Sequence, residues 1–219
     1  MRLACGSDNA AFINKEGVLC FETPQGRYEI IAAQDLKIKG EHNASNALAA
    51  AVAAHALACP FNEITDALAS FAPLEHRIEP CGSVAGVECY NDSKATNVDA
   101  TLKALAAFGE KHPIVLLGGD DKGTDLSELV EQAQRHCKAV VCFGEAGPRF
   151  LKAFAHAQLD VLEAKHLEDA LDAALAYAQS GDIVALSPAC ASFDEFSCFE
   201  ERGEVFKKLV AQRSKERGA

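Results

Sequence analysis

The sequence predicts an α/β protein in which a Rossmann-like domain with a mainly parallel sheet follows a smaller, β-rich segment. From Val84 onward, short apolar runs alternate with amphipathic segments of helical period, a pattern typical of a sheet covered by helices. The first forty residues instead contain short β-type runs separated by turn-forming residues. With 219 residues, of which 49% are hydrophobic, the chain is long enough for one full domain and a piece of another.

The first part is predicted to be a β meander followed by two helices. Short strands are predicted at residues 11–13, 17–21 and 28–33, and a turn separates each strand from the next. An Ala-rich helix is predicted to begin at a cap, Asn43 or Ser45, and to run to about Cys59. A second helix over 62–71 follows Pro60. Its apolar residues at helical spacing are Ile64, Ala67, Leu68 and Phe71.

The second part has the alternation of a parallel sheet. Its predicted strands are 84–90, 114–117, 139–143, 161–162 and 183–186. Its predicted helices are 97–108, 127–136 and 167–178. Pro73–Arg77 is the natural linker, and a boundary near Leu74 divides the chain into residues 1–73 and 74–219.

Charge and composition exclude several classes of function. The formal net charge of −11 argues against nucleic acid and anionic membrane surfaces as partners. The nine cysteines form no C-x-x-C pair, so neither a zinc site nor a disulfide framework is expected. No apolar stretch is long enough to span a bilayer. We therefore predict a reduced, cytoplasmic protein that acts on small molecules.

Polar segments follow three predicted strands, where a parallel sheet places its ligand sites. The segments are Asn91–Asn97, Gly118–Asp125 and Ser187–Phe193. Lys94 and Lys122 suit carboxylate or phosphate groups. Thr96 and Ser192 add short hydroxyls. Together they predict a pocket for a dicarboxylate; helix capping and solvated lysines are the alternative.

Other candidate groups stay ambiguous on spacing alone. Asp92 suits a ribose hydroxyl or a metal ion, but it is equally a turn former. Arg77 suits a nucleotide or a surface salt bridge. The Gly118-Gly119 pair resembles a phosphate cradle, although neither established glycine-rich phosphate motif is present. Cys190 and Cys198 are predicted to be ordinary thiols, and the histidines show no metal-ligand spacing.

Several segments, taken in order, resemble the ATP-dependent Mur ligases of peptidoglycan synthesis. They are Gly40–Ala50, Leu74–Glu79, Asn91–Asn97, Leu117–Gly123, Leu186–Phe196 and Phe199–Gly203. The later segments are similar to the members that add D-glutamate to UDP-N-acetylmuramoyl-L-alanine. The resemblance implies that residues 1–73 are the C-terminal part of a central ATP-binding domain and that residues 74–219 form a D-glutamate-binding domain.

The resemblance also implies a role for each matching residue. The ATP site would include Asn43, Asn46, Arg77 and Asp92. The D-glutamate site would include Thr96, Lys122, Ser192 and Phe199. Lys94 would be the catalytic residue near the reacting groups, and Leu74–Arg77 would be a hinge between the domains.

In such enzymes ATP phosphorylates the carboxylate of UDP-N-acetylmuramoyl-L-alanine, and the amine of D-glutamate attacks the acyl phosphate while Mg²⁺ stabilises the developing charge. The family's UDP-binding domain, P-loop and metal ligands have no counterpart in this sequence. We therefore expect the chain alone to be inactive and residues 1–73 to self-associate, whereas full-length members are expected to be monomeric. Two alternatives stay open: a non-catalytic D-glutamate- or nucleotide-binding module, and a related ligase such as a folylpolyglutamate synthase.

Overall fold

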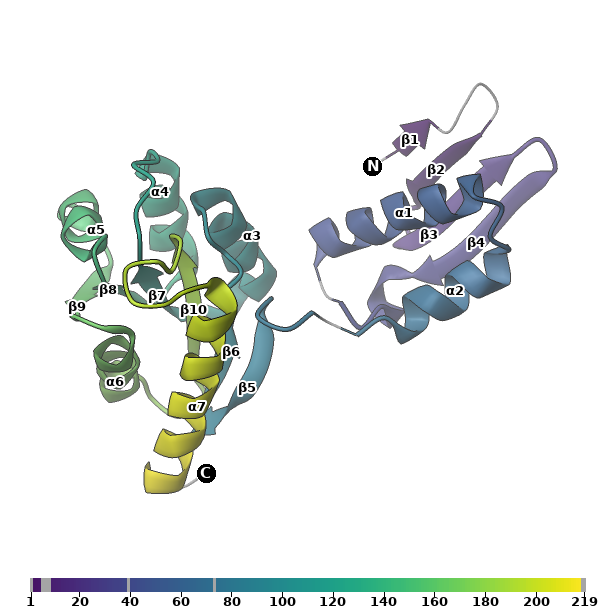
Figure 1. Cartoon of the computed structure of the whole chain (residues 1–219). Coiled ribbons are helices and arrows are strands. Elements are labelled where there is room, and N and C mark those ends of the chain that lie inside the picture. Colours follow the sequence, from purple (N-terminus) through teal and green to yellow (C-terminus); the bar gives the residue numbers. More distant parts are fainter. Residues whose placement is uncertain (1, 5–8, 39, 73, 218–219) are drawn as a thin grey trace. The chain divides into compact units, whose positions relative to one another are not determined.

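The chain folds into two compact units, Met1–Pro73 and Leu74–Ala219 (Figure 1). Each unit has its own hydrophobic core. The computed structural model describes residues 2–4, 9–38, 40–72 and 74–217. Cys5 and Pro73, which entered the sequence interpretation, lie outside the described residues. The predicted α/β class is confirmed. Among the described residues, no helix combines the length and the apolar character needed to cross a bilayer.

Unit 1 is an antiparallel meander with helices. In its described residues the strands β1 (Arg2–Ala4), β2 (Ala10–Ile13), β3 (Val18–Thr23) and β4 (Gly26–Ala32) pair in chain order. They are followed by the short 3-10 helix η1 (Ala33–Asp35), α1 (Glu41–Ala56) and α2 (Phe61–Ser70). The predicted turn before β3 is confirmed, since the Asn14 side chain accepts from Val18 N at 2.8 Å. Strand β1 was not predicted.

Two predictions for the helices of unit 1 are wrong. Helix α1 is not capped by Asn43 or Ser45, because it already begins after Gly40, which has a φ of +99° and makes no side-chain cap. Helix α2 buries Ile64, but Phe71 is 46% exposed. Phe71 follows the last residue of the helix in an extended conformation, so it leaves the face that helical spacing assigns to it.

Unit 2 is built on a six-stranded sheet in its described residues. The strands are β5 (Glu79–Val84), β6 (Val87–Asn91), β7 (Ile114–Gly118), β8 (Ala139–Phe143), β9 (Asp160–Glu163) and β10 (Ile183–Ala189). The helices are α3 (Val98–Phe108), the 3-10 helix η2 (Gly109–Lys111), α4 (Ser127–His136), α5 (Gly147–Phe154), α6 (Leu167–Tyr177) and α7 (Phe199–Arg217). The order across the sheet is β5-β6-β10-β7-β8-β9, and only the edge pair β5/β6 is antiparallel among these pairings.

The prediction of one strand over 84–90 is wrong. The chain reverses at Ala85 and Gly86, whose φ angles of +49° and +81° suit a two-residue hairpin turn between β5 and β6. Ala85 and Gly86 do not interrupt the apolar run with a polar residue, so the sequence pattern did not reveal the turn. Helices α5 and α7 were also not predicted.

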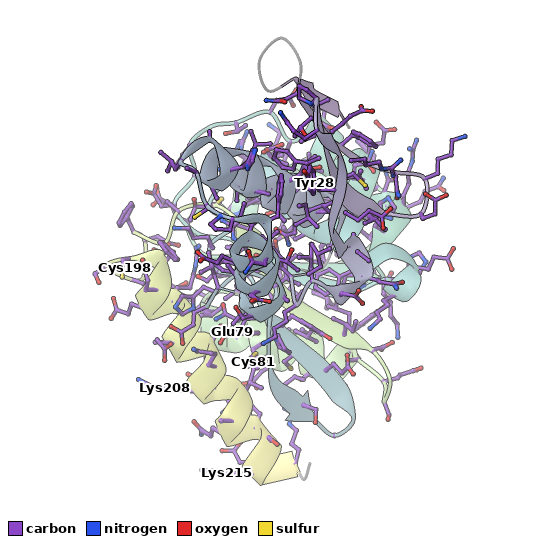
Figure 2. The ribbon with its side chains drawn as sticks, turned by 90° about the vertical axis from the view of Figure 1, so that its right-hand side faces the viewer. Tyr28, Glu79, Cys81, Cys198, Lys208 and Lys215 are labelled. Carbon is purple, nitrogen blue, oxygen red and sulfur yellow. The ribbon has the colours of Figure 1, made fainter. Side chains whose placement is uncertain are left out.

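Helices cover both faces of the sheet, because each buried strand directs alternate residues to opposite sides. In β7, Ile114 and Leu116 pack in a core with α6 and α7, whereas Val115 and Leu117 pack in a second core with α3, α4 and α5. Figure 2 shows α7 running beside β5, from Cys198 just before its first residue to Lys215 near its end.

The strand order produces a switch point at β10. This last strand lies between β6 and β7. The helices that follow β6 and β7 pack on one face, whereas α7, which follows β10, packs on the other. Connections that diverge in this way leave room outside the carboxyl end of the strand, which is where open parallel sheets bind their ligands.

A buried arginine of α7 ties this edge of the sheet together. Arg202 has no exposed surface, and its guanidinium donates to the main-chain carbonyls of Ser93, Cys190 and Ala191 and to the Ser93 hydroxyl at 2.9–3.0 Å. Burial lowers the pKa of Arg202 to about 10, so the group is still cationic at neutral pH. It joins α7 to the segments that follow β6 and β10.

Replacing Arg202 by Met is expected to destabilise unit 2 by about 3 kcal/mol or more, because buried carbonyls lose their donor. Urea unfolding followed by hydrogen exchange of unit 2 peptides measures the loss. Arg213→Met on the same helix is the matched control. Arg213 is also buried, but its partners Glu168 and Asp172 have side chains that are 57% and 38% exposed, so water can replace it and its loss should cost less, about 1 kcal/mol. Equal losses in the two variants would contradict the role of Arg202.

Candidate functional site

Three polar segments leave the sheet of unit 2 at one edge. Strands β6, β10 and β7 are parallel, hydrogen-bonded neighbours, so the segments 91–97, 187–198 and 118–125 begin side by side. Two main-chain hydrogen bonds of 3.0 and 3.1 Å between Asp120 and Ala191 join the last two segments. This edge is the candidate site.

Lys94 and Phe199 are in direct contact at this edge. The Lys94 ammonium lies 3.9 Å from the centroid of the Phe199 ring, which is a cation–π geometry. The Ser93 hydroxyl donates to the Phe199 carbonyl at 2.8 Å and so holds the first residue of α7 against the segment after β6. The contact brings together a cation and an aromatic ring that are far apart in the sequence.

Thr96 and Ser192 do not cap helices. Asn97 caps α3 by accepting from Ala100 N at 2.9 Å, and Thr96 precedes it, half-buried. Ser192 is 2% exposed and lies in a loop well before α7 begins at Phe199. The capping alternative for these two hydroxyls is therefore wrong.

Lys122 is exposed on the segment that the Asp120–Ala191 pair joins to Ser192. Its neighbour Asp121 is paired with Arg149 at 2.9 Å. Three of the four residues predicted for D-glutamate lie on these segments: Ser192 is buried, Thr96 half-buried and Lys122 exposed. The fourth, Phe199, is half-buried and begins α7 directly after the segment 187–198.

The residues predicted for the ATP site are divided between the two units. Asn43 and Asn46 lie about one turn apart on α1 of unit 1, half-buried and exposed respectively. In unit 2, Arg77 is exposed and lies between His76 and Ile78, whose φ angles are +61° and +47°. Residues other than glycine keep such left-handed conformations only where surrounding contacts enforce them.

Those contacts come from β5, β6 and α7. The Glu79 carboxylate accepts from His76 N at 2.9 Å and from the Asn91 side chain at 3.1 Å. The Asn91 amide also lies 2.9 Å from Nδ1 of the buried His76 ring. On α7, a Cβ at Gly203 would lie only 2.2 Å from the same nitrogen, so only glycine lets the ring pack there. The backbone that carries Arg77 is therefore fixed from several sides.

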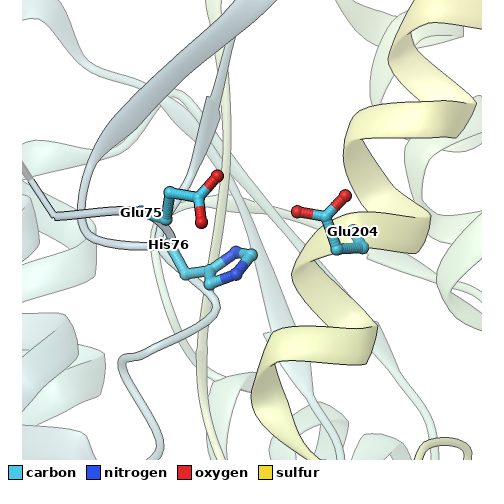
Figure 3. Close-up of side chains that lie close together, drawn as sticks. All are labelled: Glu75, His76 and Glu204. Carbon is cyan, nitrogen blue, oxygen red and sulfur yellow. The ribbon is translucent and has the colours of Figure 1, made fainter.

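Glu75, His76 and Glu204 form a group with a possible metal-ligand arrangement (Figure 3). Their ligand atoms lie within 4.8 Å of one another. However, the Lys207 ammonium lies 2.7 Å from the Glu204 carboxylate and 3.3 Å from that of Glu75. Because a cation of the chain already balances these carboxylates, we assign no metal ion to the group.

Asp92 is held inside the unit rather than at its surface. It is 4% exposed, and its carboxylate accepts from the Ser187 hydroxyl at 2.7 Å and from Ile78 N at 3.2 Å. Burial raises the pKa of Asp92 to about 7, although these hydrogen bonds and the charge of Arg77 lower it. The side chain links the end of β6, the end of β10 and the backbone beside Arg77.

The Gly118-Gly119 pair is explained by close packing. A Cβ at Gly118 would lie 2.0 Å from the Phe143 carbonyl, and one at Gly119 would lie 2.2 Å from the Ala191 carbonyl. Both residues also have a positive φ, which favours glycine. The pair lets neighbouring backbones approach, and this need accounts for it without a phosphate.

The structure also shows which residues the sequence analysis missed or set aside. Arg202 lies inside a segment quoted for the family resemblance, but no pattern marks a buried cation. Arg149 lies in the unpredicted helix α5. Cys190 is buried, which raises its pKa to about 12, as expected for an ordinary thiol rather than a nucleophile.

The stability of unit 2 is expected to depend on the ionisation of Asp92. Its pKa of about 7 in the folded chain lies above the value near 4 of an unfolded Asp, so folding favours the protonated carboxyl. That contribution is present below about pH 4 and is lost as the pH rises through about 7. The free energy of unfolding of Asp92→Asn, relative to that of wild type, should therefore increase by on the order of 3 kcal/mol between pH 4 and pH 8. Urea unfolding followed by hydrogen exchange measures this difference.

Asp172→Asn is the control, because its difference from wild type should stay nearly constant between pH 4 and pH 8. The hydrogen bond from Arg213 lowers the pKa of Asp172, so the wild-type chain loses this contribution as the pH falls below about 4. A difference between wild type and Asp92→Asn that is constant from pH 4 to pH 8 would show that Asp92 does not titrate in this range.

The chain is similar to proteins of a known family. The family model described as "Mur ligase, glutamate ligase domain" matches residues 76–190. The UDP-N-acetylmuramoylalanine–D-glutamate ligase of Koribacter versatilis is 40% identical over 202 residues, covering 92% of this chain and 44% of that protein. The ligase of the same name from Bacillus cytotoxicus is 38% identical over 209 residues, covering 94% of this chain and 43% of that protein. This chain thus spans less than half the length of these relatives.

A solved structure supports the same fold. The folylpolyglutamate synthase of Mycobacterium tuberculosis, in complex with ADP, has a TM-score of 0.64 at 18% identity, over 92% of this chain and 48% of that one. The matched family range contains the strand ends after β6 and β7 and reaches the segment after β10. The chain therefore belongs to the Mur ligase family.

Proposed function

We propose that this chain is the C-terminal part of an ATP-dependent ligase that adds D-glutamate to UDP-N-acetylmuramoyl-L-alanine in the cytoplasm, for peptidoglycan synthesis. Unit 2 binds D-glutamate, and unit 1 is the C-terminal part of the ATP-binding domain. Substrates are small molecules. Self-association through residues 1–73 stays a prediction.

One observation carries the proposal: three neighbouring strand ends place two lysines, two hydroxyls and an aromatic ring at one edge of the sheet. An amino acid with two carboxylates needs two separated cationic or hydroxyl contacts, and this edge offers them. The relatives at about 40% identity carry the name of a D-glutamate ligase, which supports the same choice of substrate.

In the proposed reaction, Lys122, Thr96 and Ser192 bind the carboxylates of D-glutamate and orient its amine. Ser192 gives a hydroxyl in a buried position, whereas exposed Lys122 gives a charge that an incoming anion meets first. Lys94, held against Phe199, stabilises the negative charge that develops when the amine attacks the acyl phosphate.

Asn43 and Asn46 on unit 1 and Arg77 and Asp92 on unit 2 are the residues that we propose for the nucleotide. The exposed guanidinium of Arg77 on its constrained backbone fits a phosphate or a flat base. ATP supplies the phosphoryl group that activates the acceptor carboxylate. We assign no Mg²⁺ ligand to the described residues of this chain. The segment Leu74–Arg77 stays our proposed hinge.

Binding of D-glutamate to the 219-residue chain tests the proposal without requiring ligation. We expect D-glutamate to shift the NMR signals of residues at the ends of β6, β7 and β10, and L-glutamate, meso-diaminopimelate and D-glutamine to bind at least about fivefold more weakly. Lys122→Ala should weaken D-glutamate binding by about tenfold, because one charge-assisted hydrogen bond is lost.

Lys152→Ala is the matched control, since Lys152 is an exposed lysine on α5 without a predicted role. Equal affinity of the wild-type chain for D-glutamate and L-glutamate would argue against the proposed substrate. Unchanged affinity in Lys122→Ala would argue against the proposed pocket.

A further inference from the structure

We infer that Arg149 is a positioning residue for Lys122, and that it acts by neutralising the adjacent carboxylate of Asp121. The inference rests on the proposed function, in which Lys122 binds a carboxylate of D-glutamate. Arg149 belongs to helix α5 and lies 28 positions from Asp121 in the sequence, so only the fold brings the two together.

Arg149 contacts the segment of Lys122 at two points. Its Nη1 lies 2.9 Å from one carboxylate oxygen of Asp121 and 3.0 Å from the other. Its Nη2 donates to the carbonyl of Thr124. The planar fork of a guanidinium is suited to this double contact, which an ammonium group cannot reproduce. The two contacted residues, Asp121 and Thr124, flank Lys122 and Gly123 in the sequence.

The contact between Arg149 and Asp121 determines whether the Lys122 ammonium pairs with Asp121 or with a ligand. A free carboxylate on the neighbouring residue would compete with an incoming dicarboxylate for the ammonium. Asp121 is instead shared between Arg149 and Gly123 N, which donates to it at 2.9 Å. Its side chain is 20% exposed. With Asp121 balanced in this way, the charge of Lys122 is available to a ligand.

The rest of the segment is fixed at both ends. At one end, Asp120 pairs with Ala191, and Ala146 N, which precedes α5, donates to the Gly119 carbonyl at 3.0 Å. At the other end, the Asp125 carboxylate accepts from Ser127 N at 2.9 Å. Lys122 is thus an exposed residue of a segment that is fixed at both ends, and Arg149 contacts this segment from α5.

Titration of D-glutamate into the wild-type 219-residue chain and four variants tests the inference. Arg149→Gln should weaken binding by about fivefold, because Asp121 then pairs with Lys122. Adding Asp121→Asn to Arg149→Gln removes the competitor and should restore the affinity to within about twofold of Asp121→Asn alone. If Arg149 only held the loop in shape, the double variant would bind no better than Arg149→Gln. Arg149→Lys, which keeps the charge but loses the fork, should fall between wild type and Arg149→Gln.

A second measurement needs no ligand. Acetic anhydride labels free amines, and mass spectrometry can follow Lys122 and the exposed Lys208 of α7 (Figure 2) in the same sample. Labelling of Lys122 should slow by about threefold in Arg149→Gln and recover in the double variant, whereas Lys208 should be unaffected. Equal labelling of Lys122 in all forms would overturn the inference. If the labelling follows the expected pattern but the wild-type chain binds no D-glutamate, the proposed function fails and the role of Arg149 in freeing Lys122 stands.

Discussion

The candidate site depends on the buried cation of Arg202. Its guanidinium uses main-chain carbonyls and one hydroxyl as acceptors, and these acceptors belong to the segments after β6 and β10. A buried cation persists only if its hydrogen bonds are satisfied, so the two segments and α7 must keep one arrangement. The same constraint reaches Gly119, where a Cβ would lie 2.9 Å from Nη1 of Arg202. One side chain thus sets the spacing of three strand ends.

A second constraint is the left-handed backbone on either side of Arg77. Such conformations cost on the order of 1–3 kcal/mol each and survive only where neighbouring contacts outweigh them. Glu79 and Asn91 provide these contacts, and Lys207 of α7 balances the charge of Glu79 at 3.4 Å. Asp92 completes the arrangement by accepting from Ile78 N. Helix α7 therefore supports both the Arg77 segment and the Arg202 contacts. This explains how a helix that packs on one face of the sheet also determines the geometry of the strand ends.

The sequence was informative wherever a structure depends on local pattern. Strands β7 and β8 are buried on both faces and are read as continuous apolar runs. The polar segments after β6, β7 and β10 mark the site because parallel strands share one carboxyl edge. The hairpin at Ala85 escaped notice because its two turn residues, Ala85 and Gly86, are not polar and do not interrupt the apolar run. Helix α5 has only eight residues, too few for its apolar face to stand out in the sequence. Helix α7 is rich in charged residues and has no clear apolar period. Arg202 and Arg149 find partners far away in sequence, and no local pattern can encode such contacts.

The distribution of charge explains how a chain with a net charge of −11 can attract an anion. Lys94, Lys122 and Arg77 are exposed at or near the strand ends. Three of the nearby carboxylates are engaged within the chain: Asp121 by Arg149, Asp194 by Glu145 N at 3.1 Å, and Asp92 by burial that raises its pKa to about 7. Local potential at a site is set by unpaired charges within a few ångströms, since more distant surface charges are screened by salt. The pairing of acidic side chains at this edge is therefore as important for binding a dicarboxylate as the presence of the lysines.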